Sequence, residues 1–476
     1  MESPIKFGTD GWRGIIAADF TYDNVRLCAQ GVADYLKESR DSARGLVIGY
    51  DTRFASEGFA AAAAEVIAGN GIKVYLCPRA TPTPVVSYGV VVKQAAGAIM
   101  ITASHNPPAW NGFKFKTDDG ASAPDDTVKQ IERDIARVYE TKGVERMALK
   151  AAEDRGLVEY FDIDPVYFAH IAELVNITRL KRSDFKVVID PMFGAGIGYL
   201  KRILSGGRLE ITEVDNERNP VFPGMKQPEP IAGNLSHLAR TIRRKKAAVG
   251  IATDGDADRL GIMDEKGEFL TTLQTFALLC LYLLEVKGER GTIVRTETST
   301  GMANKLGEIY HVPVIETAVG FKYVAPIMIK ENAIIGGEES GGYGFRGHVP
   351  ERDGILAALY FLDLMVSLKK TPSELVQHLY EKVGPHCFDR WDLEFPAAER
   401  TEIINRVKNN TPAVLGGVRV AKVDTFDGFR FTLADGAWLL VRFSGTEPLL
   451  RIYAEAGSEA QVKRLLTQGK ELAGIK

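Results

Sequence analysis

A serine stands on a rigid loop that follows an apolar strand. Residues 96–102 are apolar enough for a buried strand, and Pro107 and Pro108 keep the chain after Ser104 from entering a helix. Three neighbours would bring a base, an amide and a cation toward the hydroxyl: His105, Asn106 and Lys114. A hydroxyl with these neighbours at the carboxyl end of a strand suits covalent catalysis. A purely structural role, in which the residues cap the loop, explains them equally well. No Gly-x-Ser-x-Gly sequence surrounds Ser104, which disfavours an α/β-hydrolase.

Three aspartates occupy alternate positions directly after another apolar strand, residues 247–253. They are Asp254, Asp256 and Asp258, and the small residues between them let three carboxylates converge on one cation. Ligands that are all oxygen select Mg²⁺, Mn²⁺ or Ca²⁺ over zinc. An EF-hand is excluded because Arg259 stands where that loop needs glycine, and because strands flank the segment. A phosphotransferase of the haloacid dehalogenase type and a solvated acidic turn remain alternatives.

A glycine-rich segment offers oxygen atoms that suit a polyol. An apolar strand at 333–337 leads into Glu338, Glu339 and Ser340, and Lys322 lies shortly before them. Carboxylates and hydroxyls of this kind hydrogen-bond sugar hydroxyls. An exposed hairpin explains the segment equally well.

A loop of small residues near the C-terminus lies between two arginines, Arg442 and Arg451. Backbone N–H groups in such a turn can bind an anion, and arginine offers a planar fork that matches phosphate oxygens. The loop is not a Walker A sequence, because the terminal Lys-Ser/Thr is missing. We therefore predict a phosphate site that includes Ser444, Gly445 and Thr446.

The elements that position these loops follow a pattern that occurs three times, at residues 45–77, 185–214 and 291–317. In each case an apolar strand leads through a polar or glycine-rich loop to a helix and a second strand. Apolar strands that alternate with helices indicate sheets covered on both faces. We predict three related α/β domains with mixed sheets, with a single large doubly wound sheet as the alternative.

The chain from about residue 381 has a different character. Its strands have nearly alternating polarity and are separated by Asp-Gly dipeptides, which suit hairpin turns. This pattern predicts an antiparallel α+β domain with a closing helix at 459–472. The predicted strands are residues 417–424, 429–433, 438–443 and 449–454.

Composition limits the class of protein. The chain has 476 residues, which predicts roughly three domains, and a net charge of −3, which argues against nucleic acid or a membrane surface as a partner. The longest apolar run, residues 275–286, is shorter than the ~20 residues a bilayer requires. The first residues are polar and contain no apolar signal region, and the four cysteines form no CxxC pair. We expect a soluble, cytoplasmic protein.

Together the four loops resemble the signature loops of the α-D-phosphohexomutase family, which contains phosphoglucomutases, phosphomannomutases and phosphoglucosamine mutases. The matching segments are residues 102–107, 254–259, 337–341 and 442–448, with a further match at 8–14. The resemblance implies four domains around a central cleft, each of which contributes one loop. The expected domains are 1–160 for the phosphoserine, 161–268 for the metal, 269–380 for the sugar and 381–476 for the phosphate.

The resemblance also assigns roles to matching residues. Ser104 would be the phosphoserine and would share one Mg²⁺ with Asp254, Asp256 and Asp258. The substrate would contact Arg259, Lys322, Glu338 and Ser340, and its non-reacting phosphate would contact Arg442, Ser444, Gly445, Thr446 and Arg451. The transfer site would contain Arg13, His105 and Lys114, with Lys114 or His105 as the general base.

The reaction that the resemblance implies is the interconversion of hexose 1-phosphate and hexose 6-phosphate. A hexose 1,6-bisphosphate would be both intermediate and activator, and the phosphosugar would be the small-molecule partner of a monomer or homodimer. Glu339 and Ala257 favour glucose, while mannose stays possible although Met and His, typical of dual-specificity relatives, are absent from positions 339 and 342. The alternatives are a phosphoglucosamine mutase and a bisphosphate synthase or phosphatase. A non-catalytic sugar-phosphate sensor is disfavoured because Ser104 and the three aspartates are intact.

Overall fold

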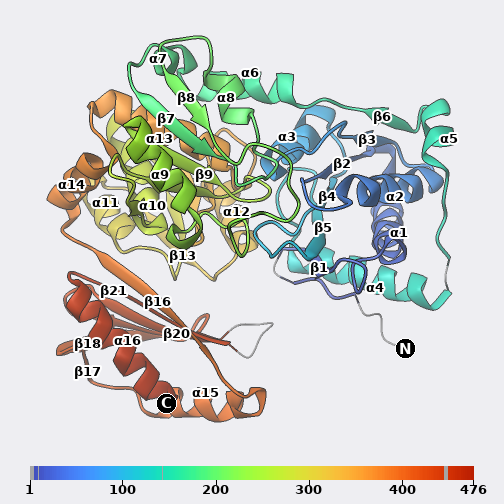
Figure 1. Ribbon diagram of the computed structural model, residues 1–476. Coiled ribbons are helices and arrows are strands. Elements are labelled where there is room, and N and C mark those ends of the chain that lie inside the picture. Colours follow the sequence, from blue (N-terminus) through green and yellow to red (C-terminus); the bar gives the residue numbers. More distant parts are fainter. Residues whose placement is uncertain (1–4, 9, 142, 444–448, 476) are drawn as a thin grey trace.

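The computed structural model describes residues 5–8, 10–141, 143–443 and 449–475. Within these residues the strands form four separate sheets, one after another along the chain. The first three lie within one elongated body, and the fourth lies beneath one end of it (Figure 1). We call the parts built on these sheets domains 1 to 4. The predicted class, three α/β domains and an antiparallel C-terminal domain, is confirmed, while the predicted domain limits stay predictions.

Domain 1 has a six-stranded sheet of order β1-β5-β4-β2-β3-β6. Strands β2, β3, β4 and β6 are parallel, whereas β5 runs antiparallel to β4 and β1. All of β4 is buried, as an apolar strand between two helical layers must be. The elements are β1 (Trp12–Ile15), α1 (Tyr22–Glu38), β2 (Leu46–Tyr50), α2 (Ser56–Gly69), β3 (Val74–Leu76), α3 (Thr83–Lys93), β4 (Ala98–Ile101), β5 (Trp110–Lys116), α4 (Asp125–Thr141), α5 (Leu149–Asp154) and β6 (Val158–Tyr160).

Domain 2 contains the second of the three predicted strand–helix–strand units. Strand β7 is parallel to β8 and β9, and β10 returns antiparallel beside β9. The helix expected within residues 185–214 is α8, Tyr199–Leu204. The elements are α6 (Asp164–Leu174), α7 (Ile177–Lys181), β7 (Lys186–Asp190), α8 (Tyr199–Leu204), β8 (Glu210–Glu213), α9 (Ser236–Lys245), β9 (Val249–Thr253), β10 (Leu260–Met263) and β11 (Phe269–Leu270).

Domain 3 contains the third unit. Strand β12 is parallel to β13 and β14, and β15 is antiparallel to β14. The elements are α10 (Thr272–Leu281), β12 (Ile293–Thr296), α11 (Met302–Tyr310), β13 (Val314–Thr317), α12 (Phe321–Glu331), β14 (Ile335–Gly337), β15 (Tyr343–Phe345), α13 (Gly354–Leu368) and α14 (Pro372–Val383).

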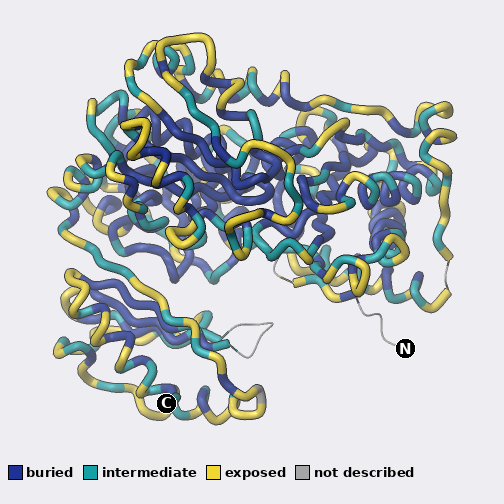
Figure 2. Tube along the Cα trace, in the orientation of Figure 1, coloured by how far each residue is buried: buried dark blue, intermediate teal, exposed yellow. Residues whose placement is uncertain are grey.

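One hydrophobic core joins the first three domains. It includes Val85 of α3, Val187 of β7 and Leu356 of α13, each 0% exposed. Helix α13 is apolar on nearly every side, which is the composition of a helix buried in a large core. Figure 2 shows buried, dark-blue trace in the interior of all three domains, which share this core. The loops at their strand ends are therefore held in a fixed relation to one another.

Domain 4 is an antiparallel sheet of order β16-β21-β20-β19-β18-β17 with a separate core. Helix α16 packs on β21, β20 and β16. The four predicted strands and the closing helix are confirmed. The elements are β16 (Cys387–Glu394), α15 (Arg400–Asn409), β17 (Val414–Leu415), β18 (Val418–Asp424), β19 (Phe429–Leu433), β20 (Trp438–Phe443), β21 (Leu449–Ala456) and α16 (Glu459–Ala473).

Strand β16 was not predicted, because charged residues interrupt it. Asp389, Arg390, Asp392 and Glu394 leave no apolar run that marks a strand. The strand forms because it pairs with β21 along its whole length. In the described part of the chain, no helix is both long enough and apolar enough to cross a bilayer.

Candidate active site

Ser104 lies on the loop between β4 and β5 and is 2% exposed. Its hydroxyl donates a hydrogen bond to Oδ2 of Asp254 (2.9 Å), and Nδ1 of His105 lies 3.3 Å from the same hydroxyl oxygen. The backbone φ of Ser104 is +52°, a left-handed conformation that few residues other than glycine adopt. The loop therefore holds the hydroxyl in one direction, toward domain 2.

The three aspartates lie on the loop between β9 and β10 of domain 2, and all three are fully buried. One carboxylate oxygen from each lies within 4.8 Å of the other two. The backbone N–H groups of Asp258 and Arg259 donate to Oδ1 of Asp254 (3.0 and 3.1 Å), which bends the loop around that side chain. A β-carbon at Gly255 would lie only 2.4 Å from the carbonyl oxygen of Ser104, so the close approach of the two loops requires glycine.

The electrostatics of this triplet fit a divalent cation. Burial, and then the charges of Asp258 and Asp256, raise the pKa of Asp254 well above its ordinary value. Among the described residues, the Oδ1 atoms of Asp256 and Asp258 have no hydrogen-bond partner. Converging buried carboxylates with free oxygens are the donor set of a hard cation such as Mg²⁺. The structure thus shows a group of ligands that could hold one metal ion beside Ser104.

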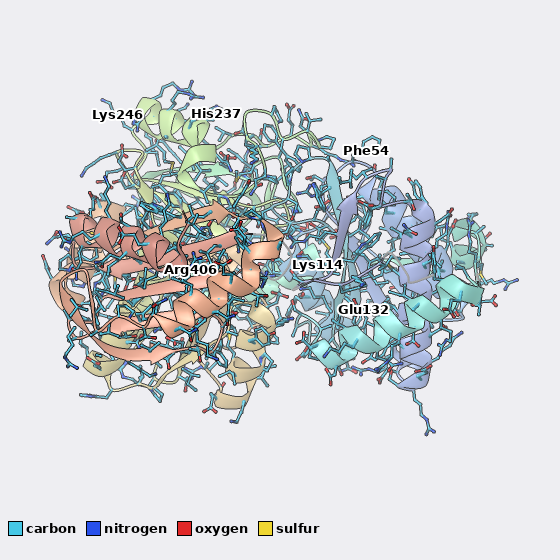
Figure 3. All side chains as sticks on the ribbon, turned by 90° about the horizontal axis from the view of Figure 1, so that it is seen from below. Phe54, Lys114, Glu132, His237, Lys246 and Arg406 are labelled. Atoms are coloured by element: carbon cyan, nitrogen blue, oxygen red, sulfur yellow. The ribbon has the colours of Figure 1, made fainter. Side chains whose placement is uncertain are left out.

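Lys114 brings positive charge to the triplet from strand β5. Its Nζ lies 2.8 Å from Oδ2 of Asp10, 3.1 Å from Oδ2 of Asp256 and 4.0 Å from Oδ2 of Asp258. Burial alone would lower the pKa of Lys114, but these carboxylates outweigh it and keep the ammonium charged. Figure 3 shows Lys114 at the junction between domain 1 and the rest of the molecule.

The other residues predicted for the transfer site, and the predicted substrate contact Arg259, lie around the same centre. Arg13 on β1 donates to the side chain of Asn106. Arg259 forms an ion pair with Glu229 (3.0 Å). Burial, and then the charges of nearby arginines and Lys114, lower the pKa of His105 well below its ordinary value, so that its imidazole is neutral.

Arg352 is a cation of the site that sequence reasoning missed. It precedes α13, and its Nη2 lies 2.8 Å from Asp258 and 3.0 Å from Asp10, while Nη1 lies 3.5 Å from Glu338. The only signal was Asp353, whose side chain caps α13, because an aspartate before an apolar run marks a helix start. That signal predicts only that Arg352 lies at a helix end. It does not predict that Arg352 lies beside the metal loop, residues 254–259.

The predicted sugar loop, residues 337–341, is hydrogen-bonded to the first residue after the metal loop. The N–H of Leu260 donates to the carbonyl oxygen of Gly341 (2.9 Å). Glu338 is 5% exposed, and burial raises its pKa to about 7 even though Arg352 acts in the opposite direction. The hydroxyl of Ser340 is buried without a partner among the described residues. Glu339 points elsewhere, because the hydroxyls of threonines in domain 3 donate to its carboxylate: Thr296 and Thr298.

Two predicted cations face a cavity of about 580 Å³ between domains 3 and 4. Lys322 of α12 and Arg442 of β20 both line it. One oxygen of Asp427 accepts hydrogen bonds from Nε of Arg442 and from the N–H of Val319, each 3.1 Å long. Arg451 lies opposite Arg442 on the neighbouring strand. The predicted residues Ser444, Gly445 and Thr446 lie outside the described residues.

The structure thus divides the predicted residues into groups. One group surrounds Ser104 and the aspartates and contains Arg13, His105, Lys114 and Arg259. Glu338 joins this group through Arg352. Arg442 and Arg451 lie on domain 4, whereas Lys322 lines the cavity beside Arg442 but pairs its ammonium with Asp125 of domain 1 (2.6 Å). The roles predicted for individual residues stay predictions, because the structure shows only their positions.

Four descriptions of one protein family match successive parts of the chain. "Phosphoglucomutase/phosphomannomutase, alpha/beta/alpha domain I", domain II and domain III match residues 4–142, 165–267 and 273–383. The C-terminal domain of the same family matches residues 402–471. The order of the four matches is the order of the four sheets.

Full-length relatives agree with this assignment. A phosphoglucomutase/phosphomannomutase of Thermococcus kodakarensis is 30% identical, with 98% of each chain covered. A phosphoglucosamine/phosphogalactosamine mutase of Sulfurisphaera tokodaii is 29% identical, again with 98% of each chain covered. A solved structure from Thermus thermophilus, provisionally named a phosphomannomutase, is 34% identical over 100% of both chains and superimposes with a TM-score of 0.86.

The four family matches, in the order of the three α/β domains and the antiparallel fourth, identify the class of protein as a phosphosugar mutase. The chain belongs to the phosphoglucomutase/phosphomannomutase family, whose members are isomerases.

Proposed function

We propose that this enzyme interconverts hexose 1-phosphate and hexose 6-phosphate through a phosphoserine at Ser104. The observation that supports this most directly is the 2.9 Å hydrogen bond from the Ser104 hydroxyl to Asp254. In this hydrogen bond a hydroxyl oxygen of domain 1, the proposed nucleophile, lies against the aspartate triplet of domain 2. A nucleophile and a metal-binding group that meet across two domains are the parts that phosphoryl transfer needs.

The chemistry follows from this geometry. The bond between the Ser104 oxygen and phosphorus breaks as a sugar hydroxyl forms a bond to the same phosphorus, which produces a hexose 1,6-bisphosphate. The hydroxyl gives its proton to a base, for which the neutral imidazole of His105 is the candidate, and the Ser104 oxygen takes up a proton as its bond to phosphorus breaks. Lys114, the other predicted base, stays charged and therefore cannot accept a proton. The bisphosphate then turns end over end and returns its other phosphoryl group to Ser104, so the same compound added in trace amounts is the activator.

Charge is balanced by groups from several domains. A phosphoserine carries a charge of about −2 at neutral pH and lies beside the aspartates, so Lys114, Arg259 and Arg352 are needed to offset the negative charge. A Mg²⁺ ion held by the three aspartates would stabilise the charge that develops on the transferring phosphoryl group. The far phosphate of the substrate would bind where Lys322 and Arg442 line the same cavity.

We propose glucose phosphates as the preferred substrates, with mannose phosphates possible. The support is in the sequence, where Glu339 and Ala257 favour glucose. Names among the relatives cover glucose, mannose and amino sugars, so the three classes must be compared directly. The small-molecule partner is in every case a phosphorylated hexose.

The proposal is tested by a coupled assay on glucose 1-phosphate together with intact-protein mass spectrometry. We expect one added phosphoryl group on the wild type after incubation with glucose 1,6-bisphosphate and none on Ser104→Ala. The variant should lose turnover, whereas Ser205→Ala, at an exposed serine in domain 2, should not. If Ser104→Ala turned over as fast as the wild type with added bisphosphate, the proposal would be wrong. Mannose 1-phosphate and glucosamine 1-phosphate in the same assay decide the substrate class.

A further inference from the structure

A completely buried arginine lies directly beneath the serine loop. Arg53 follows strand β2, which is the parallel neighbour of β4, and it is 0% exposed. The next residue, Phe54, is 61% exposed, and Figure 3 shows it at the surface of the molecule. The chain therefore turns a charged side chain inward and an aromatic one outward. A buried charge of this kind requires partners.

The partners of Arg53 are the carbonyl oxygens of the serine loop. The guanidinium donates to four of them: Ser104 (2.6 Å), Asn106 (2.6 Å), Pro107 (2.9 Å) and Trp110 (3.0 Å). Five N–H donors in a rigid plane are what allow one side chain to gather several acceptors. A single residue of the β2 loop thus determines the course of the whole turn that carries the nucleophile.

A second chain of contacts connects Arg53 to the N–H of Ser104. Nε of Arg53 lies 3.2 Å from Oδ2 of Asp51, and this same oxygen accepts a hydrogen bond from Oγ1 of Thr102 (2.6 Å). Oγ1 of Thr102 in turn accepts from the N–H of Ser104 (2.8 Å). Both the N–H and the C=O of Ser104 are therefore fixed by the Arg53–Asp51 pair.

This fixation explains how Ser104 keeps its backbone φ of +52°. A residue other than glycine stays in that region only where the surroundings determine it strongly. The conformation directs the hydroxyl to Asp254. Without the guanidinium, the turn would be free to relax to a negative φ and to carry the hydroxyl away from the triplet.

The arrangement also orients peptide dipoles. The C=O and N–H of a trans peptide point in opposite directions, and the described chain contains no cis peptide bond. Because the Ser104 carbonyl points at Arg53, the N–H of His105 is directed away from Arg53. Pro107 and Pro108 have no N–H, so the peptide units Asn106–Pro107 and Pro107–Pro108 present only their carbonyl oxygens. The guanidinium donates to both, the carbonyl oxygens of Asn106 and Pro107.

We propose that Arg53 is a positioning residue for phosphoryl transfer at Ser104. It holds four carbonyl dipoles on the inner side of the loop, away from the transferring group, and it keeps the Ser104 oxygen beside the aspartate triplet. The inference rests on the proposed function, because it assumes that Ser104 carries the phosphoryl group. It adds a residue that acts through the backbone of the serine loop.

The test compares Arg53→Ala and Arg53→Lys with the wild type. Arg218→Ala is the matched control, because Arg218 donates to the carbonyl oxygens of Thr52 and Arg53 on the same loop. Its other hydrogen bonds among the described residues go to Glu57 and not to the serine turn. We expect kcat of Arg53→Ala to fall about 100-fold, as a misplaced reacting group does, with little change in KM. Arg53→Lys, which keeps the charge but cannot reach four acceptors, should also lose most of its kcat. The control should retain its kcat.

Guanidinium ion added to the assay distinguishes a positioning role of Arg53 from a merely structural one. At concentrations that leave the wild type folded, it should restore part of the kcat of Arg53→Ala and the rate at which bisphosphate phosphorylates Ser104, measured by intact mass. It should not activate the wild type or Arg218→Ala. Variants that melt earlier but turn over normally per phosphorylated molecule would overturn the inference, as would an Arg53→Lys enzyme with wild-type kcat. A wild type without mutase activity would instead refute the proposed function itself.

Discussion

The guanidinium of Arg352 lies 2.8 Å from the carboxylate of Asp258, which joins the segment before α13 in domain 3 to the metal loop of domain 2. Arg352 also forms ion pairs with Asp10 and Glu338. These contacts connect domain 1, the metal loop and the sugar loop through one side chain. The three loops are therefore coupled electrostatically as well as by the shared hydrophobic core.

Replacement of Arg352 by methionine should destabilise the fold. The change leaves buried carboxylates without their counter-charge, which typically costs about 3–5 kcal/mol, and urea unfolding measures it. Arg352→Lys should retain part of the stability, because it keeps one charge. Arg346→Met, at a partly exposed arginine that pairs with Glu289, serves as the control and should cost much less. An Arg352→Met protein as stable as this control would show that the network contributes little.

The sequence was informative where chemistry depends on local spacing. Ser104 and the aspartates lie at strand ends, so a few consecutive residues revealed both their type and their placement. Lys114 follows Ser104 by ten positions, and its contact with Asp256 depends on β5 running antiparallel to β4. Arg352 contacts Asp10, Asp258 and Glu338, which are remote in sequence, and no local pattern encodes such a meeting.

Removal of metal should affect the wild type and Asp254→Asn differently. Mg²⁺ that binds only the folded state raises its stability, by about 2.7 kcal/mol at a concentration one hundred times its dissociation constant. Without metal, Asp254→Asn should be at least as stable as the wild type at pH 8, because it relieves repulsion among buried carboxylates. Thermal melts with EDTA and with Mg²⁺ measure both effects.

The decisive quantity in these melts is the effect of Mg²⁺ on the melting temperature of the wild type compared with that of Asp254→Asn. We expect a Mg²⁺-dependent rise in melting temperature for the wild type and for the surface control Asp118→Asn, and no rise for Asp254→Asn. An equal rise in all three proteins would place the metal elsewhere.

Asp190 should make the stability of domain 2 depend on pH. The side chain is 1% exposed, and burial together with the charge of Asp215 raises its pKa to about 8, against about 3.9 in the unfolded chain. The folded state therefore keeps a proton that the unfolded state releases, and stability falls as pH rises from about 4 to about 8. The slope has an upper limit of about 1.4 kcal/mol per pH unit.

Asp190→Asn should remove this dependence. The variant should be more stable than the wild type at pH 8 and closer to it at pH 5, as measured by urea unfolding at both values. The exposed Asp184→Asn should follow the wild type at each pH. A stability difference between Asp190→Asn and the wild type that does not grow with pH would contradict the assignment.

Asp427 should control how well the cavity between domains 3 and 4 binds phosphate. Its Oδ2 accepts from Nε of Arg442 in domain 4 and from the N–H of Val319 in domain 3, so one carboxylate fixes the arginine and ties the two walls of the cavity together. Asp427→Ala frees both donors. Hydrogen bonds to charged groups contribute about 1.5–3 kcal/mol, and their loss should raise the KM for glucose 1-phosphate about tenfold or more.

Asp427→Asn distinguishes orientation from charge. The amide oxygen can still accept from Arg442, so this variant should keep a KM close to that of the wild type, and inorganic phosphate should inhibit it at least as well, because a negative charge beside the phosphate site is gone. Asp424→Ala removes a carboxylate of the same domain that pairs with Lys422 and should leave both constants unchanged. If the alanine and asparagine variants weakened binding equally, the charge of Asp427 would matter rather than its acceptor geometry. If neither changed KM, the far phosphate would bind outside this cavity, and Lys322 and Arg442 would lose their proposed role.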